Sequence, residues 1–129
     1  MPALRYKVFV YGTLLVPDIM REVTGRQYAG ESAVLPGYRR YRIRHRSYPG
    51  IIAEPGASVT GTLFNMGPVA LAAIDRYEDA CYERRPVTVA VNGEPRQAYA
   101  YVIPDSRRHL LEDKEWDLDF WRRCQRRAR

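Results

Sequence analysis

A carboxylate in the middle of the chain is the residue best placed for acid–base chemistry. Pro68 begins a predicted helix, in which Leu71 and Ile74 have the spacing of one buried face. Glu78 is the next position on that face, so a helix that continues this far would carry a carboxylate on its core side. Burying an unpaired carboxylate costs free energy, so the group must be hydrogen-bonded, ion-paired, protonated or open to a cavity. At a cavity wall, Glu78 would be a general base with a raised pKa.

A second interpretation of the same segment needs no chemistry. If the helix ends by Tyr77, Glu78 turns outward and pairs with Arg84 or Arg85 on the surface. Spacing alone leaves both interpretations open.

Another candidate site follows the first predicted strand, where the sequence FVYGTLL stops an apolar run at Gly12. A strand end of this kind exposes backbone N–H groups, and Gly12 lets the chain approach a ligand closely or take a positive φ. Such amides could hold a carboxylate or a developing oxyanion. The alternative is a plain tight turn. A Walker-type phosphate loop is excluded, because its Gly-Lys pair is absent.

Covalent and metal chemistry have less support in the sequence. Nothing in the spacing brings Cys81 or Cys124 to His45 or His109, and the two cysteines fit neither a disulfide framework nor a CxxC site. Two histidines without a carboxylate cluster do not make a metal-binding pattern. We therefore expect no metal and no cofactor. Four tyrosines are candidates for packing or for one ligand contact: Tyr77, Tyr82, Tyr99 and Tyr101.

Short strands and a few helices must position these residues. Residues 17–24 form a predicted helix, with Pro17 at its first position and Gly25 just beyond its end. The dipeptide Asn92-Gly93 predicts a hairpin. Strands are predicted at residues 7–11, 32–35, 38–46, 58–65, 85–91 and 97–103. This pattern predicts a small antiparallel barrel, or a barrel-like sheet, with one or two packed helices.

The composition is that of one globular domain. The chain has 129 residues, of which 46% are hydrophobic and 28% charged, so it is long enough for one core and too short for two. No apolar run approaches the roughly 18 residues of a membrane span, and the N-terminus lacks a signal-peptide pattern. We expect a cytoplasmic protein with no membrane partner. We assign residues 1–121 to a single domain and residues 122–129 to an Arg-rich C-terminal tail.

The charge is unbalanced toward arginine. The chain has 21 Lys and Arg residues against 15 Asp and Glu residues, for a net charge of +6. One basic group is the tail, and the other is the predicted strand 38–46, whose alternation would place Arg40, Arg42, Arg44 and Arg46 on one solvated face. Clusters of basic residues could bind a polyanion, but the sequence contains no motif that contacts bases in a groove of DNA. Nucleic-acid binding is therefore the least favoured function.

Four motifs follow one another along most of the chain: VFVYGTL, SYPGI, VTGTLF and AAIDRYEDACYERRPVTV. In this order they resemble the gamma-glutamylcyclotransferase-like family, of the gamma-glutamylamine cyclotransferase type. The resemblance implies an α+β fold, a small mixed but mainly antiparallel β-barrel with one to three flanking helices. It implies that Glu78 is the catalytic base. It also implies a substrate-binding loop made of Tyr11, Gly12, Thr13 and Leu14.

The reaction implied by the resemblance is the release of 5-oxoproline and a free amine from a small γ-glutamyl amine or amide. An enzyme of this acyltransferase or lyase type works without a cofactor, because both reacting groups belong to one molecule. Apart from the resemblance, such a substrate has an α-carboxylate that Arg84 or another pocket cation could hold; the alternative is that Arg84 and Arg85 simply face water. Asp79 stands where the family commonly has glycine, and it adds a negative charge beside the base. The alternative function is a catalytically silent module of the same fold that binds a small ligand.

Overall fold

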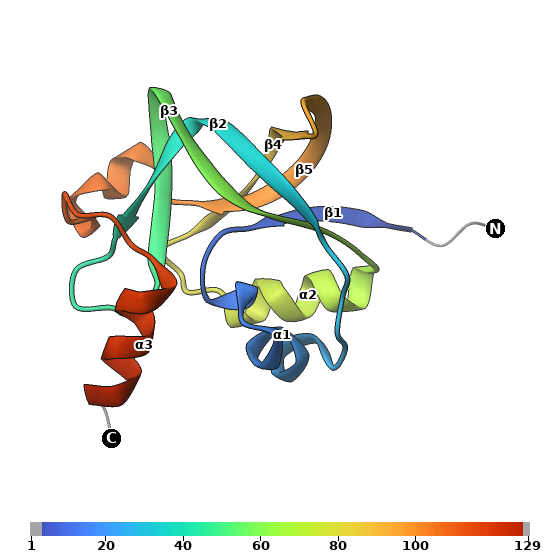
Figure 1. Ribbon diagram of the computed structural model, residues 1–129, viewed down its shortest axis with the longest axis horizontal. Coiled ribbons are helices and arrows are strands. Elements are labelled where there is room, and N and C mark those ends of the chain that lie inside the picture. Colours follow the sequence, from blue (N-terminus) through green and yellow to red (C-terminus); the bar gives the residue numbers. More distant parts are fainter. Residues whose placement is uncertain (1–3, 128–129) are drawn as a thin grey trace.

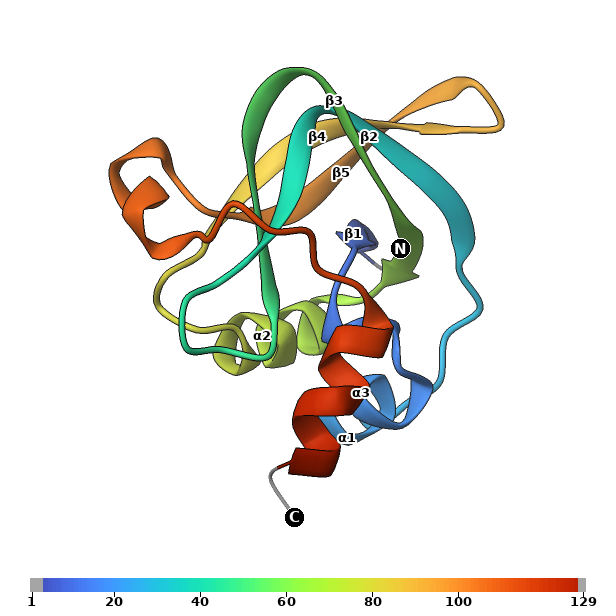
Figure 2. The same ribbon diagram turned by 60° about the vertical axis from the view of Figure 1, so that its left-hand side comes forward.

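Five strands of the chain form a closed barrel in the computed structural model, which describes residues 4–127. The hydrogen-bonded order is β1-β3-β2-β4-β5, and the barrel closes where β5 meets β1 (Figure 2). Every pair is antiparallel except β1 with β5, which is parallel. The predicted α+β fold with a mixed, mainly antiparallel barrel is confirmed. The strands are β1 (Tyr6–Val10), β2 (Glu31–Arg42), β3 (Pro49–Met66), β4 (Glu83–Val91) and β5 (Glu94–Val102).

The helices lie on the outside of the barrel. Figure 1 shows α1 and α2 packed beside each other beneath it, while α3 extends away from them. None of the helices within residues 4–127 is long and apolar enough to cross a membrane. The α-helices are α1 (Pro17–Thr24), α2 (Pro68–Tyr77) and α3 (Leu118–Arg127), and the short 3-10 helices are η1 (Thr13–Leu15) and η2 (Asp105–Leu110).

Strand β1 is buried on both faces because side chains alternate along a strand. Phe9 points into the barrel and packs in the same cluster as Leu35. Val8 and Val10 point outward and pack in the cluster that covers Leu71 and Ile74 of α2. The apolar run at the start of the sequence therefore fixes the end of β1 beside α2.

Strands β2 and β3 are longer than predicted. The predicted strands 32–35 and 38–46 are one strand with a register shift between Pro36 and Tyr38, and β3 begins well before residue 58. Gly37 and Gly56 have φ values of 81° and 84°, in the region that glycine adopts most readily. The Pro and Gly residues therefore mark a bend within a continuous hairpin, and the prediction of separate strands was wrong.

The end of β2 also differs from the prediction. The strand stops at Arg42, and the segment that follows η2 bonds along it, with the Arg42 N–H donating to the Lys114 carbonyl (N···O 2.9 Å). Arg40 and Arg42 are half-buried as a result. Arg40 Nη1 donates to the Tyr11 carbonyl oxygen (2.7 Å), and Arg42 Nε donates to that of Glu115 (2.8 Å). The predicted solvated row of arginines is therefore not formed.

The C-terminal arginines belong to a helix over most of their length. Helix α3 contains residues 122–127, so the predicted domain boundary at residue 121 falls within it. Residues 128 and 129 of the predicted tail lie outside the described residues. No residue of α3 is buried. The helix contacts the barrel through Phe120, whose ring centre lies 4.0 Å from the guanidinium of Arg42 in β2.

Candidate active site

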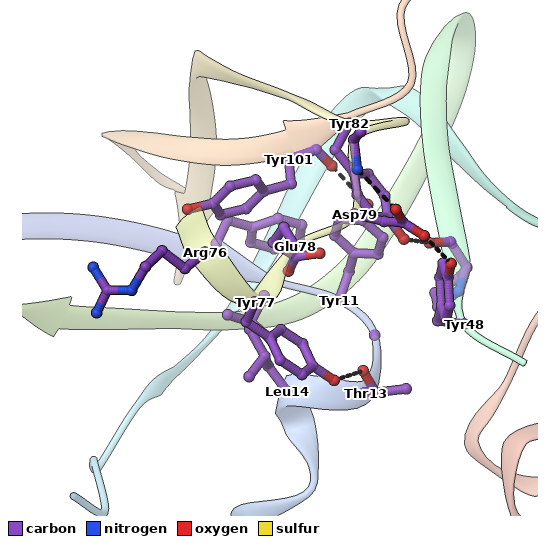
Figure 3. Close-up of a pocket in the computed structure, with 15 residues that line it drawn as sticks. Tyr11, Thr13, Leu14, Tyr48, Arg76, Tyr77, Glu78, Asp79, Tyr82 and Tyr101 are labelled. Carbon is purple, nitrogen blue, oxygen red and sulfur yellow. Dashed lines mark hydrogen bonds between the residues drawn. The ribbon is translucent and has the colours of Figure 1, made fainter. Parts of the chain in front are cut away.

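One cavity of about 370 Å³ lies beside the ends of β1 and α2 (Figure 3). Its wall consists of residues 9–14, residues 76–80, Tyr48 with Pro49, and Tyr82 with Tyr101. The structure therefore brings to one cavity the predicted base, Glu78, and the four residues of the predicted substrate loop, Tyr11, Gly12, Thr13 and Leu14.

Glu78 reaches this cavity because α2 ends one residue before it. Leu71 and Ile74 are buried as predicted, and the Glu78 N–H makes the last helical bond, to the Ile74 carbonyl (N···O 2.9 Å). Glu78 itself has an extended backbone with ψ 140°, so the helix ends at Tyr77, as the second interpretation of this segment predicts, and the interpretation in which it continues through Glu78 is wrong. The N–H of Ala80 donates to Asp79 Oδ1 (2.9 Å), and this local bond favours a turn over another helical residue.

The alternative surface ion pair of Glu78 is not formed either. Arg84 Nη1 donates to Asp75 Oδ2 (2.6 Å), and Arg85 Nη2 donates to Glu83 Oε2 (2.6 Å). The Glu78 carboxylate makes no hydrogen bond or ion pair with any residue between 4 and 127. Its side chain is half-buried, and Figure 3 shows the carboxylate pointing into the space between tyrosine rings.

The surroundings of Glu78 make it an unusually strong carboxylate base. Burial raises the pKa of Glu78 to about 8, and the negative charges of Asp79 and then Asp75 add to the shift. The hydroxyl of Tyr48 and the N–H of Ala80 both donate to the Asp79 carboxylate and lower its pKa. Two adjacent acids thus have widely separated pKa values, which suits one of them to exchange a proton near neutral pH.

The loop after β1 forms another wall of the cavity. Gly12 has φ −128°, so a positive φ is not the reason for glycine there. A Cβ atom at Gly12 would lie 2.9 Å from Cγ of Pro49, so the reason is close packing. The N–H of Leu15 donates to the Gly12 carbonyl (N···O 2.9 Å) and starts η1. The N–H groups of residues 12–14 have no acceptor in the described part of the chain, as at the start of any helix.

Two buried tyrosines tie the wall of the cavity to neighbouring strands. The Tyr11 hydroxyl donates to the Tyr101 carbonyl oxygen (2.6 Å), and the Tyr82 hydroxyl donates to the Pro49 carbonyl oxygen. Burial, followed by nearby negative charge, raises the pKa of Tyr11 and Tyr82 far above the usual value. Both hydroxyls therefore stay protonated near neutral pH, where they act as hydrogen-bond donors.

The other tyrosines differ in position. Tyr77 and Thr13 are joined by a hydrogen bond between their hydroxyl oxygens (3.2 Å), which links α2 to the loop. Tyr99 is not part of the cavity wall and packs near the ring of Tyr6 instead. Tyr48 was missed as a candidate, although it lies in the SYPGI motif, which is the signal that could have found it.

The remaining polar candidates lie outside the cavity or point away from its centre. Arg84 is not in the wall, and it is paired with Asp75. Arg76 is in the wall, but Figure 3 shows its side chain pointing away from Glu78. Cys81 and Cys124 are free thiols. Within residues 4–127, no three His, Cys, Asp or Glu side chains gather in a way that could hold a metal ion.

Comparison with known proteins identifies relatives along nearly the whole chain. The family model described as gamma-glutamyl cyclotransferase, AIG2-like, matches residues 8–118. AIG2-like protein D of Arabidopsis thaliana is 34% identical over 121 residues, which cover 91% of this chain and 79% of that protein. AIG2-like protein C of the same plant is 33% identical over 120 residues, covering 91% of this chain and 69% of that protein.

Solved structures share the fold. A solution structure of an Arabidopsis thaliana protein matches with a TM-score of 0.78 at 28% identity, covering 98% of this chain and 78% of that one. A structure of a gamma-glutamyl cyclotransferase matches with a TM-score of 0.68 at 18% identity, covering 78% of this chain and 67% of that one, which shows likeness of fold alone. Because the family model spans most of the sequence, this chain belongs to the gamma-glutamyl cyclotransferase, AIG2-like family.

Proposed function

We propose that this chain is a γ-glutamyl cyclotransferase that releases 5-oxoproline and a free amine from a small γ-glutamyl amine or amide. Glu78 is the general base. The observation that carries the proposal is its unpaired carboxylate, with a pKa of about 8, in the same cavity as residues 11–14. Membership of the family supports the same class of reaction.

The proposed reaction moves two protons from the substrate α-nitrogen to the leaving nitrogen and exchanges one C–N bond for another. The Glu78 carboxylate takes a proton from the substrate α-ammonium group, and the freed nitrogen lone pair attacks the side-chain carbonyl carbon. A five-membered ring forms, and the carbonyl electrons move onto its oxygen. The bond to the amine half then breaks as Glu78 returns the proton to that nitrogen. The ring nitrogen, which still carries two hydrogens and a positive charge, gives its second proton to Glu78, and the released amine takes up this proton and leaves as an ammonium ion. The two products together contain the atoms of the substrate, so no co-reactant is consumed.

The raised pKa of Glu78 is what makes the proton transfer feasible. An ordinary glutamate, with a pKa of 4.5, would hold the proton of an ammonium group only rarely. A pKa of about 8 brings the carboxylate close to an α-amino group, whose pKa is about 8 in a peptide. Once proton transfer is possible, the pocket needs only to hold the amine near the carbonyl, because ring closure within one molecule has a high effective concentration.

We assign the anionic parts of the substrate to the loop after β1. Arg76 points away from Glu78, whereas the N–H groups of residues 12–14 have no acceptor among residues 4–127. Backbone N–H groups of this kind stabilise a carboxylate or the oxyanion that develops on the attacked carbonyl oxygen. The loop is therefore proposed to bind the substrate, with Glu78 acting on its amine.

The test is release of 5-oxoproline from a panel of γ-glutamyl amines and amides by the purified chain. Each substrate has two matched controls, its N-acetyl derivative, whose amine is blocked, and its α-glutamyl isomer. We expect release only from substrates with a free amine and a γ-linkage. Calorimetric binding of the γ-glutamyl compounds without release of 5-oxoproline would instead identify a silent binding module. Equal release from the N-acetyl compounds would overturn the mechanism.

A further inference from the structure

A second carboxylate near the end of α2 is bonded to the barrel through both of its oxygens. Asp75 lies three residues before Glu78 and is not in the cavity wall. The Tyr101 hydroxyl of β5 donates to Asp75 Oδ1, and Arg84 Nη1 of β4 donates to Asp75 Oδ2 (2.6 Å). Strands β4 and β5 pair with each other along their length. These two bonds therefore fix the end of α2, and with it Glu78, to one side of the barrel.

The same set of bonds extends to the loop on the other wall of the cavity. The carbonyl oxygen of Tyr101 accepts a hydrogen bond from the Tyr11 hydroxyl (2.6 Å). Tyr101 is thus bonded through its hydroxyl to the helix that precedes Glu78 and through its backbone to the residue that begins the loop. Arg84, Asp75, Tyr101 and Tyr11 form a continuous path between the two halves of the site.

We propose that Asp75 is a positioning residue: its hydrogen bonds to Tyr101 and Arg84 hold Glu78 on the barrel, and its charge, partly offset by Arg84, acts on the Glu78 carboxylate. Its importance for turnover rests on the proposed function. The coupling between the two carboxylates exists whether or not the chain acts on a substrate, so the two proposals can fail separately.

The charges around Glu78 support this role. The negative charge of Asp75 raises the pKa of Glu78, after burial and Asp79. The side chains of Arg84 and Asp75 are 34% and 41% exposed, so water screens their influence but does not remove it. Four further titratable groups interact with the charge of Glu78 and have raised pKa values, namely Tyr11, Cys81, Tyr82 and Tyr101. Of the remaining groups in the cavity wall, Tyr48 donates to Asp79, Tyr77 shares a hydrogen bond with Thr13, and Arg76 points away from Glu78.

The experiment measures the protonation of Glu78 directly, by carbon NMR titration of protein labelled with ¹³C in its glutamate carboxyl groups. The Glu78 signal is assigned by its loss in Glu78→Gln. At low ionic strength, Asp75→Asn should lower the Glu78 midpoint and Arg84→Gln should raise it, each by about 0.5–1 pH unit. Arg84→Lys should keep the wild-type midpoint. Arg85→Gln is the matched control, because Arg85 pairs with Glu83, and it should have no effect.

The opposite signs of the two shifts make the result decisive. Unchanged midpoints, or shifts in the same direction, overturn the proposal. If Asp75→Asn does not fold, Arg84→Gln decides alone. If the chain releases 5-oxoproline, the acid side of the pH profile of kcat/KM should shift together with the NMR midpoint of Glu78. A variant of Asp75 that lowers kcat without shifting this profile would show that Asp75 has only a structural role. A chain that releases no 5-oxoproline while the midpoints move as expected would defeat the proposed function and leave this inference standing.

Discussion

At the scale of single residues, Glu78 and Asp79 show how neighbouring carboxylates acquire different chemistry. Asp79 accepts hydrogen bonds from Tyr48 and from the N–H of Ala80, which stabilise its charged form and lower its pKa. Glu78 has no such partner among residues 4–127, and burial raises its pKa to about 8. The charge on Asp79 then adds to the cost of charging Glu78. Asp79 therefore strengthens the proposed base.

Replacing Glu78 by glutamine should abolish turnover and preserve the fold. The amide is nearly isosteric but cannot accept a proton, so kcat/KM for release of 5-oxoproline should fall on the order of 100-fold or more. Substrate binding, measured by calorimetry, should persist. The matched control is Asp79→Asn, which should retain release because the Asp79 carboxylate accepts hydrogen bonds and is not the proposed base. Wild-type release by Glu78→Gln would show that the base is another group.

The pH dependence of kcat/KM should report the raised pKa of Glu78. Only the deprotonated carboxylate accepts a proton, so activity should be lost as pH falls through about 8, far above the ordinary value of 4.5. On the acid side, kcat/KM should fall about tenfold per pH unit. Asp79→Asn removes a charge that raises this pKa, so its acid limb should shift to lower pH. The measurement is the steady-state kcat/KM at a series of pH values. An acid-side pKa near 4.5 in this profile would contradict the assignment of Glu78 as a base with a raised pKa.

At the scale of elements, the site depends on how closely the loop after β1 packs on its neighbours. Gly12 lies against Pro49, the first residue of β3, with no room for a Cβ atom between them. From the other side, Arg40 of β2 donates to the Tyr11 carbonyl oxygen (2.7 Å), and its guanidinium lies 5.5 Å from the centre of the Trp116 ring. The loop is thus held by β2 and β3, in addition to its own strand.

Adding a methyl group at Gly12 should displace the loop. In Gly12→Ala the new Cβ would lie 2.9 Å from Pro49 Cγ, so the chain must shift, at a cost of about 1–3 kcal/mol in the free energy of unfolding. We expect lower release of 5-oxoproline and a lower Tm. The double variant Gly12→Ala/Pro49→Ala keeps the Pro49 backbone carbonyl and removes the obstructing ring, so it should recover part of both losses. A single variant with wild-type turnover and Tm would remove the loop from the proposed mechanism.

Removing the Arg40 guanidinium should weaken the attachment of the loop after β1 to β2, because Arg40 donates a hydrogen bond to the Tyr11 carbonyl oxygen. Arg40→Met keeps much of the packing with Trp116 but loses the bond to the Tyr11 carbonyl. Small displacements of a catalytic group are costly, so kcat/KM should fall about 10- to 100-fold. Arg39→Met is the matched control, because Arg39 pairs with Glu54 and Glu115 and should leave kcat/KM unchanged. Equal effects of the two variants would indicate a general loss of surface charge.

Local signals in the sequence predicted most elements but not how two of them end. Pro17 and Pro68 start α1 and α2 as predicted, and the Asn92-Gly93 hairpin joins β4 to β5. The β2–β3 hairpin was predicted in pieces, because proline and glycine residues that usually end strands here form a bend. The end of α2 is favoured by Asp79, whose carboxylate accepts a hydrogen bond from the N–H of Ala80 in the turn that follows the helix. The spacing along a helix face therefore pointed to Glu78, although Glu78 lies just beyond the end of that helix.

At the scale of the whole molecule, barrel closure brings the site together. The parallel contact of β5 with β1 places Tyr101 beside the strand that leads to the loop, and α2 then covers the outer faces of β1 and β3. Residues 11 and 78 are far apart in the sequence, and no local pattern pairs them. Their shared cavity was predicted only through the resemblance to a family. The bonds of Arg40 and Asp75 were not predicted, because they depend on side chains that meet across the barrel.

Removing the arginine-rich end should separate charge from catalysis. Truncation after Trp121 takes away residues 122–129 and keeps Phe120, whose ring lies 4.0 Å from the Arg42 guanidinium. Because no residue of α3 is buried and none lines the cavity, release of 5-oxoproline should stay within about twofold of the full chain. Salt-dependent retention on an anionic polymer should weaken, because at least four exposed arginines are lost.

A second truncation before Leu118 also removes Phe120, and any loss of Tm confined to this variant would show that the Phe120 contact stabilises the barrel. A folded first truncation that lost turnover would instead make α3 part of the site.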